Sequence, residues 1–284
     1  MVEFLQALQY PLVQRAVVTG ALAGVTCGVV GSLVVVRRIT YLGAGIAHCV
    51  LGGMGAAMYA RTVGGVSWLH PLHGAVLAAL LAAVAIGLVS LRFRQREDTV
   101  ISALWAIGMA AGVLFIWATP GYREDLMSYL FGSVTLVSRQ GVWLIAALTA
   151  VAILTTAACY KQFLAICFDE EFARTRGVNV EAYYLLLLGL TALSVVTLVS
   201  VVGVVLVIAL LTLPVAAAAV FTRRLWKLML LSAALSVVLV LGGLAVSYAP
   251  ELPAGATTIV LAGGVYLLVL AGAAVKRRLR PSAR

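Results

Sequence analysis

Long apolar runs place the strongest constraint on this chain. Each run approaches the roughly 20 residues that an α-helix needs to cross the hydrocarbon core of a bilayer, and charged or turn-forming residues separate the runs. Only 11% of the residues are charged, against about 25% in soluble domains. The sequence therefore predicts an all-α, polytopic membrane protein with about nine transmembrane helices. The expected ranges are 16–36, 44–60, 72–91, 98–118, 139–159, 182–200, 203–221, 228–248 and 256–275.

The Lys and Arg residues indicate how the helices are oriented. Most of them fall in alternate connections, which the positive-inside rule assigns to the cytoplasm. An odd number of spans places the N-terminus outside and the C-terminus in the cytoplasm. Runs 182–200 and 203–221 meet with almost no connection, so one broken helix there would leave eight spans. Because the net charge of +10 follows this topology, it indicates a lipid bilayer as the partner and not nucleic acid.

One non-cytoplasmic connection, 119–138, is more than a linker. Its apolar portion is too short to span a bilayer and too apolar for a solvated loop. The sequence predicts a short periplasmic or re-entrant helix at about 124–136.

The chain carries no recognisable energy source of its own. None of its ten acidic residues falls in the middle of an apolar run, whereas ion-coupled carriers commonly keep an ionisable relay inside the bilayer. Sodium can still be bound by backbone carbonyls alone. There is no Gly-Lys-Ser/Thr phosphate loop and no His-Glu-x-x-His zinc motif. We expect a transport subunit that is not an enzyme, a conduit whose energy comes from elsewhere.

A short charged segment, FDEEFARTRGV at 168–178, interrupts the apolar pattern. Asp169 is a favourable N-cap, and Gly177 can take the left-handed conformation that ends a helix. Glu170 and Arg174 are spaced to pair at i and i+4. The pattern predicts a helix of about two turns.

The same helix would be amphipathic. Phe168 and Phe172 stand four residues apart and would form an apolar stripe opposite the charges. So short a helix is marginal alone in water and needs a surface to pack on. One possibility is that the helix packs on a partner protein. The other is that the segment is a solvated cytoplasmic loop whose aromatic side chains lie against the bilayer.

Together with three other stretches, this segment resembles the permease subunits of zinc and manganese ABC importers. The stretches are DLMSYLFGSVTLVS at 125–138, VVGVVLVIALLTLPVAAAA at 201–219 and PAGATTIVLAGGVYLLVL at 253–270. The resemblance extends over nearly the whole chain. It implies a single transmembrane permease domain, 1–284, with the fold of the type II ABC importers in the inner membrane.

The resemblance also implies partners and a mechanism. It implies a homodimeric permease, two ABC ATPase subunits and a periplasmic metal-binding protein, with no covalently bound cofactor and with Zn²⁺ or Mn²⁺ as cargo. Segment 168–178 would be the coupling helix that docks in a groove of the ATPase. The residues that would carry this role are Asp169, Glu170, Glu171, Phe172, Arg174 and Gly177.

His48 is the only histidine in the middle of an apolar run. It shares one helical strip with Ala44, Gly52 and Ala56, and these small residues either let another helix approach or leave space beside the imidazole. His48 is therefore either a packing residue or a weak metal ligand in the pore. The permease family that this chain resembles usually has an acidic residue where this chain has Ala44. The residues that would bind the metal, and the choice of metal, therefore stay open.

Two other functions remain open. The first is a cation carrier or channel that works without ATP, and the second is an ABC permease for iron or a chelated metal.

His70 and His73 at the next span are expected to be interfacial side chains, and a role at the metal entrance is the alternative.

Overall fold

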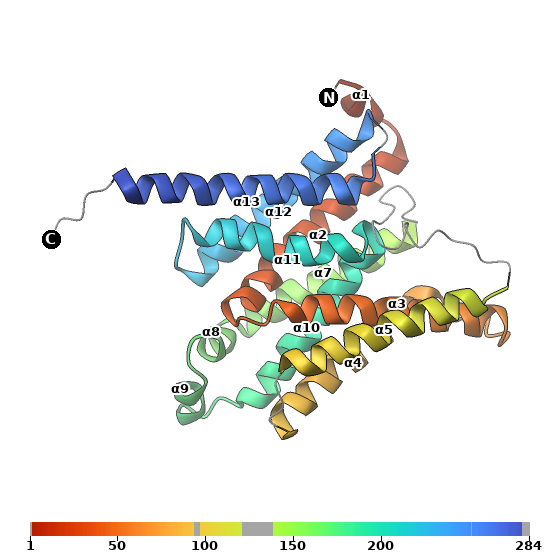
Figure 1. Cartoon of the computed structure of the whole chain (residues 1–284), viewed down its shortest axis with the longest axis horizontal. Coiled ribbons are helices and arrows are strands. Elements are labelled where there is room, and N and C mark those ends of the chain that lie inside the picture. The colour runs from red at the N-terminus through yellow and green to blue at the C-terminus, as the bar shows by residue number, and fades with distance from the viewer. Residues whose placement is uncertain (1, 94–96, 121–138, 251, 280–284) are drawn as a thin grey trace.

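The structure, a computed structural model, describes residues 2–93, 97–120, 139–250 and 252–279. All regular elements in these ranges are helices (Figure 1). They are α1 (Val2–Ala7), α2 (Pro11–Val36), α3 (Tyr41–Thr62), α4 (Pro71–Phe93), α5 (Glu97–Ala118), α7 (Arg139–Ala158), α8 (Tyr160–Phe168), α9 (Glu170–Thr175), α10 (Val180–Val202), α11 (Val204–Ala219), α12 (Leu225–Tyr248) and α13 (Ala254–Leu279).

Each of the nine apolar runs forms a helix. Within the described ranges, eight helices are long and apolar enough to cross a membrane, namely α2, α3, α4, α5, α7, α10, α12 and α13. The remaining run forms α11, which has only 16 residues. The helix expected at about 124–136 lies outside the described residues.

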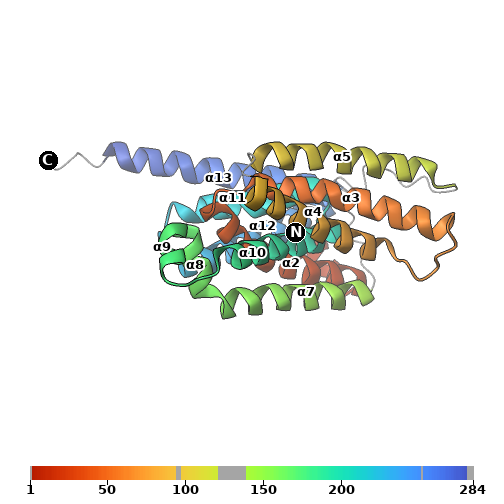
Figure 2. The ribbon, with the colours of Figure 1, turned by 90° about the horizontal axis from the view of Figure 1, so that it is seen from below.

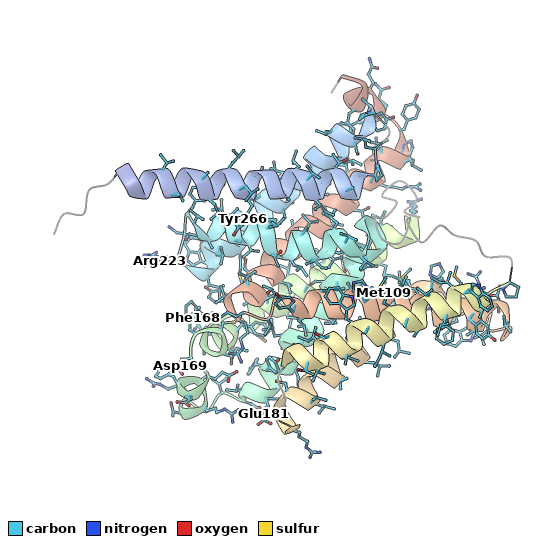
Figure 3. All side chains as sticks on the ribbon, viewed as in Figure 1. Met109, Phe168, Asp169, Glu181, Arg223 and Tyr266 are labelled. Carbon is cyan, nitrogen blue, oxygen red and sulfur yellow. The ribbon has the colours of Figure 1, made fainter. Side chains whose placement is uncertain are left out.

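The connection between α10 and α11 is a single glycine. Gly203 has φ +84° and ψ 164°, a conformation that residues with a Cβ rarely adopt. The region is therefore two helices with a sharp corner between them, and the eight long spans in the described residues agree with the lower of the two numbers expected from the sequence. Figure 3 places Arg223, which follows α11, at the same end of the molecule as Phe168 and Asp169.

The helices differ greatly in how much of their surface the protein covers. The membrane-spanning windows of α2 and α3 are 67% and 78% buried, while those of α5 and α13 are 17% and 11% buried. Figure 2 shows α5 and α13 along one side of the bundle, α7 along the other, and α2, α10 and α12 between them. The core is thus built around α2, α3 and α10, the last with a window that is also 67% buried. The outer helices expose apolar side chains, as lipid-facing helices do.

Small residues bring α2 and α12 into close contact. A Cβ built on Gly28 would lie only 2.1 Å from the backbone nitrogen of Ala233. The hydroxyls of Ser32 and Ser232 lie 2.9 Å apart, and Ser232 also donates to the Gly28 carbonyl at 2.8 Å. Small residues and inter-helical hydroxyl bonds of this kind hold helices together where lipid offers no hydrophobic driving force.

Candidate functional site

The segment between α7 and α10 forms two short helices. α8 runs for nine residues and ends at Phe168, and α9 runs for six residues from Glu170. Asp169 between them is extended, with φ −154°, and its carboxylate accepts a hydrogen bond from the Phe172 N–H at 2.9 Å. The N-cap predicted at Asp169 is present, and the six residues of α9 make nearly the two turns expected. α8 was not foreseen as a separate helix.

The end of α9 is also fixed by its backbone. Gly177 has φ +76°, and its N–H donates to the Arg174 carbonyl at 3.0 Å. The Val178 N–H donates to the Ala173 carbonyl at 3.1 Å, which completes a Schellman motif. Ala173 is fully buried, so this ending anchors α9 against the bundle.

The predicted pairing of Glu170 with Arg174 is wrong. Glu170 forms an ion pair with Arg37 at the end of α2, and Arg174 lies 4.0 Å from the Glu181 carboxylate on α10. The reason is that α9 starts at Glu170, so this side chain can turn toward the bundle. Arg37 is one of the basic residues in the connections that the positive-inside rule assigns to the cytoplasm, and no sequence signal links it to a residue 133 positions away.

The other side of α9 points away from the bundle. Phe168 and Phe172 are 65% and 53% exposed, and the Arg176 guanidinium lies 5.2 Å from the centre of the Phe172 ring. Glu171 and Arg174 are exposed beside them. We call Phe168, Glu171, Phe172 and Arg174 the α9 surface. Two exposed aromatic rings set among charges suit contact with another protein.

His48 lies inside the protein, against α5. Its side chain is only 7% exposed, and its ring stacks on Trp105 with centroids 4.7 Å apart and planes inclined by 13°. The buried Nδ1 atom has no hydrogen-bond partner among the described residues. A buried polar atom without a partner is unfavourable, and it leaves His48 an unused lone pair or donor.

The small residues around His48 let α5 approach, as the sequence suggested. A Cβ on Gly52 would lie 2.8 Å from the Gly108 carbonyl oxygen. On the outside of α5, Trp105 and Met109 line an open, mostly apolar depression of about 740 Å³; Figure 3 marks Met109. Trp105 therefore stands between His48 and this depression.

No preformed metal cage exists in the described part of the chain. Nowhere in it do three or more His, Cys, Asp or Glu side chains gather closely enough to hold an ion. Ala44, where an acid was expected from the resemblance, is buried in α3. His48 is thus the candidate metal ligand on α3, and Ala44, one turn before it, supplies no carboxylate to assist it.

His70 and His73 use their Nδ1 atoms at the start of α4. The His73 Nδ1 accepts from the His70 N–H, and the His70 Nδ1 accepts from the Leu72 N–H, both at 3.3 Å. Burial lowers the pKa of His70, and electrostatic interaction with His73 and Arg61 lowers it further. With Nδ1 accepting, the neutral ring carries its proton on Nε2, so the arrangement supports an interfacial role over metal binding.

Residues 9–273 match the sequence model of a family described as the ABC 3 transport family. The chain belongs to the ABC 3 transport family. One relative, "Uncharacterized membrane protein slr2045" of Synechocystis sp., is 41% identical over 94% of this chain and 92% of its own length. Another, "Manganese transport system membrane protein MntC" of Halalkalibacterium halodurans, is 32% identical over 93% of this chain and 88% of its own.

A solved structure is similar over nearly the whole chain. A chain in the structure of PsaBC from Streptococcus pneumoniae in complex with Fab superposes with a TM-score of 0.83 at 28% identity, covering 94% of both chains. The present chain is therefore an all-α, multi-pass metal transport permease of an ABC system. ATP is hydrolysed on a separate subunit of such a system. The resemblance and the expectation of a transport subunit are confirmed, and an ATP-independent carrier or channel is not favoured.

Proposed function

We propose that the chain, as a single permease domain, 1–284, imports Mn²⁺ or Zn²⁺ across the inner membrane as one half of a homodimer. A periplasmic metal-binding protein would deliver the ion, and two ABC ATPases would drive the change between outward-open and inward-open states. The N-terminus would lie outside and the C-terminus in the cytoplasm. The name of the relative MntC supports manganese, and the missing acid at Ala44 leaves zinc as the second cargo to test.

The α9 surface is the observation that carries this proposal. It presents two exposed Phe rings, Phe168 at the end of α8 and Phe172 on α9, and Figure 3 shows Phe168 at one end of the molecule. The ends of α9 are fixed by Asp169 and Gly177. The chain has no nucleotide-binding loop of its own. An exposed, rigidly capped helix is the means by which such a chain can receive work from an ATPase. Asp169, Glu170, Glu171, Phe172, Arg174 and Gly177 would together form and hold this coupling helix.

His48 is the residue that we propose to meet the metal ion during transit. The orphaned Nδ1 supports this role, because imidazole nitrogen is a good ligand for both Zn²⁺ and, less selectively, Mn²⁺. One imidazole per chain binds a divalent ion weakly, and two related by the dimer axis would bind it only transiently. A weak site suits a conduit because the ion must leave as readily as it arrives.

The experiment is uptake by the purified chain in liposomes with and without its ATPase. We expect accumulation of radiolabelled Mn²⁺ or Zn²⁺ only when the ATPase and ATP are present on the side of the α9 surface. Replacing Phe172 by Asp should abolish association with the ATPase. Phe221, which is 70% exposed and lies beside Arg223, provides the control, because Phe221→Asp makes the same change outside α9.

Two results would contradict the proposal. One is accumulation against a gradient by the permease alone, which would restore the ATP-independent carrier. The other is an unchanged ATPase interaction in Phe172→Asp. Competition between Mn²⁺, Zn²⁺ and Fe²⁺ in the same liposomes identifies the cargo.

A further inference from the structure

The end of α2 is held in an unusual turn. Arg38 has φ +65°, the left-handed region that normally requires glycine. The Ile39 N–H donates to the Val34 carbonyl at 3.0 Å, and Ile39 is 92% buried, with 8% exposure. A non-glycine residue in this conformation is strained by about 1–2 kcal/mol. The turn is thus maintained by the surrounding structure, and it fixes the position of Arg37, the residue that caps the end of α2.

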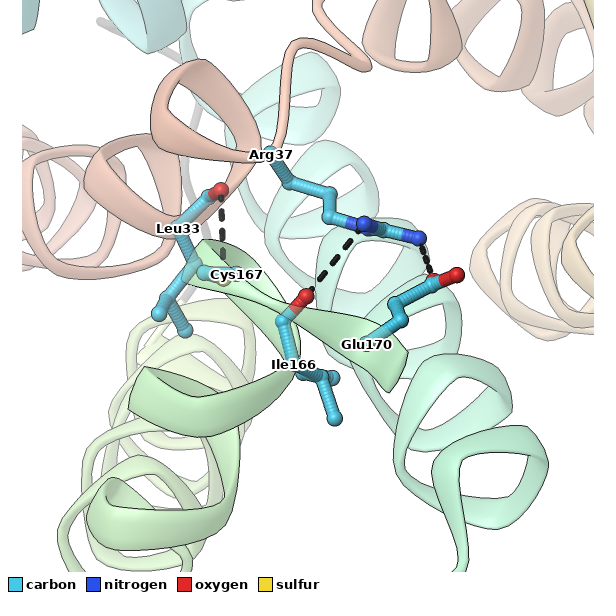
Figure 4. A network of polar contacts seen from close by, with 5 residues as sticks. All are labelled: Leu33, Arg37, Ile166, Cys167 and Glu170. Atoms are coloured by element: carbon cyan, nitrogen blue, oxygen red, sulfur yellow. Dashed lines mark hydrogen bonds and ion pairs between the residues drawn. The ribbon is translucent and has the colours of Figure 1, made fainter. Parts of the chain in front are cut away.

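From this position Arg37 contacts three separate segments, and Figure 4 shows two of these contacts, to Glu170 and to Ile166. Its Nη2 donates to the Glu170 carboxylate in the first turn of α9. Its Nη1 donates to the Ile166 carbonyl near the end of α8 at 3.2 Å. Its guanidinium carbon lies 5.7 Å from the centre of the Tyr184 ring on α10.

The surroundings make this contact stronger than a surface ion pair. The side chains of Arg37 and Glu170 are only 23% and 37% exposed, so solvent screens them less than a fully exposed pair. The positive charge is felt nearby: burial raises the pKa of Cys167 to about 11, and Arg37 opposes that rise. Arg is suited to this place because its planar fork can donate to two acceptors while its face lies on an aromatic ring.

α9 has few other links to the bundle. Its six residues are too short to be stable alone, and only Ala173 among them is buried. α2, in contrast, is one of the most buried spans and packs against α7, α10, α11 and α12. Arg37 is the charged group that joins this central helix to α8 and α9.

We propose that Arg37 is a positioning residue that transmits movement of α9 to α2. A push on the α9 surface would reach the centre of the bundle through the Arg37–Glu170 pair and the Ile166 carbonyl, and without Arg37 the short helices would shift while α2 stayed in place. This role rests on the proposed function, because it requires an ATPase that acts on α9.

The test compares uptake with ATP hydrolysis in one preparation. The full-length chain is assembled with its ATPase in liposomes, and the ions of Mn²⁺ or Zn²⁺ accumulated per ATP hydrolysed are measured. We expect this ratio to fall about tenfold in Arg37→Gln, the factor that a lost charge-assisted hydrogen bond gives in an equilibrium, while ATP hydrolysis and assembly persist. Arg37→Lys, which keeps the charge, should recover part of the ratio.

Two further variants separate transmission from general damage. Arg38→Gln removes the neighbouring charge from an exposed side chain and should keep the wild-type ratio. In Glu170→Gln the ratio should also fall, and the double variant Arg37→Gln/Glu170→Gln should be no worse than Arg37→Gln alone, because coupled residues are non-additive. If Arg37→Gln does not fold, Glu170→Gln against Arg37→Lys provides the same comparison.

The possible failures are distinguishable. A wild-type complex without ATP-dependent uptake overturns the proposed function before any variant is measured, and the role of Arg37 with it. With an active wild type, an unchanged ratio in Arg37→Gln overturns the transmission role alone. A fall of uptake and ATP hydrolysis in the same proportion also overturns the transmission role. The role is overturned as well if the effects of Arg37→Gln and Glu170→Gln on the ratio multiply in the double variant.

Discussion

Gly28 on α2 offers the sharpest test of how closely the central helices are packed. In the variant Gly28→Ala the added methyl carbon would lie 2.1 Å from the nitrogen and 2.2 Å from the Cα of Ala233, against the 3.4 Å at which ordinary contact begins. These are backbone atoms of α12 and cannot rotate away. α2 and α12 would have to separate by about 1.3 Å locally, the difference between 3.4 and 2.1 Å.

The expected loss of stability is about 2 kcal/mol. Overpacking costs roughly 1–3 kcal/mol, and the rigid backbone neighbour places Gly28→Ala toward the upper end. Alanine recovers about 0.5–1 kcal/mol through its better helix propensity. Separation would also stretch the Ser232 hydrogen bonds to Ser32 and to the Gly28 carbonyl, now 2.9 and 2.8 Å. For a chain of this size the net change lowers Tm by about 5 °C.

Thermal unfolding of the detergent-purified protein measures this change. Gly189→Ala on α10 is the matched control, because nothing lies within 4 Å of a Cβ built there. Helix propensity alone should leave its Tm unchanged or raised by about 1–2 °C. If Gly28→Ala unfolds at or above the wild-type temperature while Gly189→Ala behaves as expected, the close α2–α12 crossing does not exist.

Two further predictions concern α9 and the pore. Gly177→Ala should reduce ATP-dependent uptake because a Cβ at φ +76° is strained by about 1–2 kcal/mol, whereas Gly177→Asn, which tolerates that region, should retain most of it; equal uptake in the two variants would show that the helix ending does not matter. His48→Ala should lower metal flux without loss of ATPase association, measured by uptake and by co-purification, and an unaltered flux would leave His48 as a packing residue against Trp105.

The sequence predicted what depends on local rules. Apolar run length located every long helix, because a bilayer requires whole helices of a set length. Asp169 and Gly177 were found for a similar reason: helix capping is decided within a few residues.

What depends on tertiary contacts could not be predicted. The i, i+4 rule assigned Glu170 to Arg174, but the actual partner, Arg37, comes from a helix end 133 residues earlier. The stacking of His48 on Trp105 likewise joins α3 to α5, and helical periodicity identified only the strip on which His48 lies. A rule based on neighbours in sequence cannot choose between partners that the fold supplies.

The corner at Gly203 has a consequence for the bilayer. A helix of 16 residues, as α11 is, measures about 24 Å, which is less than the roughly 30 Å of the hydrocarbon layer. Gly203 provides no side-chain acceptor for the first N–H groups of α11. Hydrocarbon offers these N–H groups no hydrogen-bond acceptor either. Val204 is fully buried, so the surrounding helices shield this corner from lipid. Any rearrangement during the transport cycle has to keep it covered by protein or wetted by water.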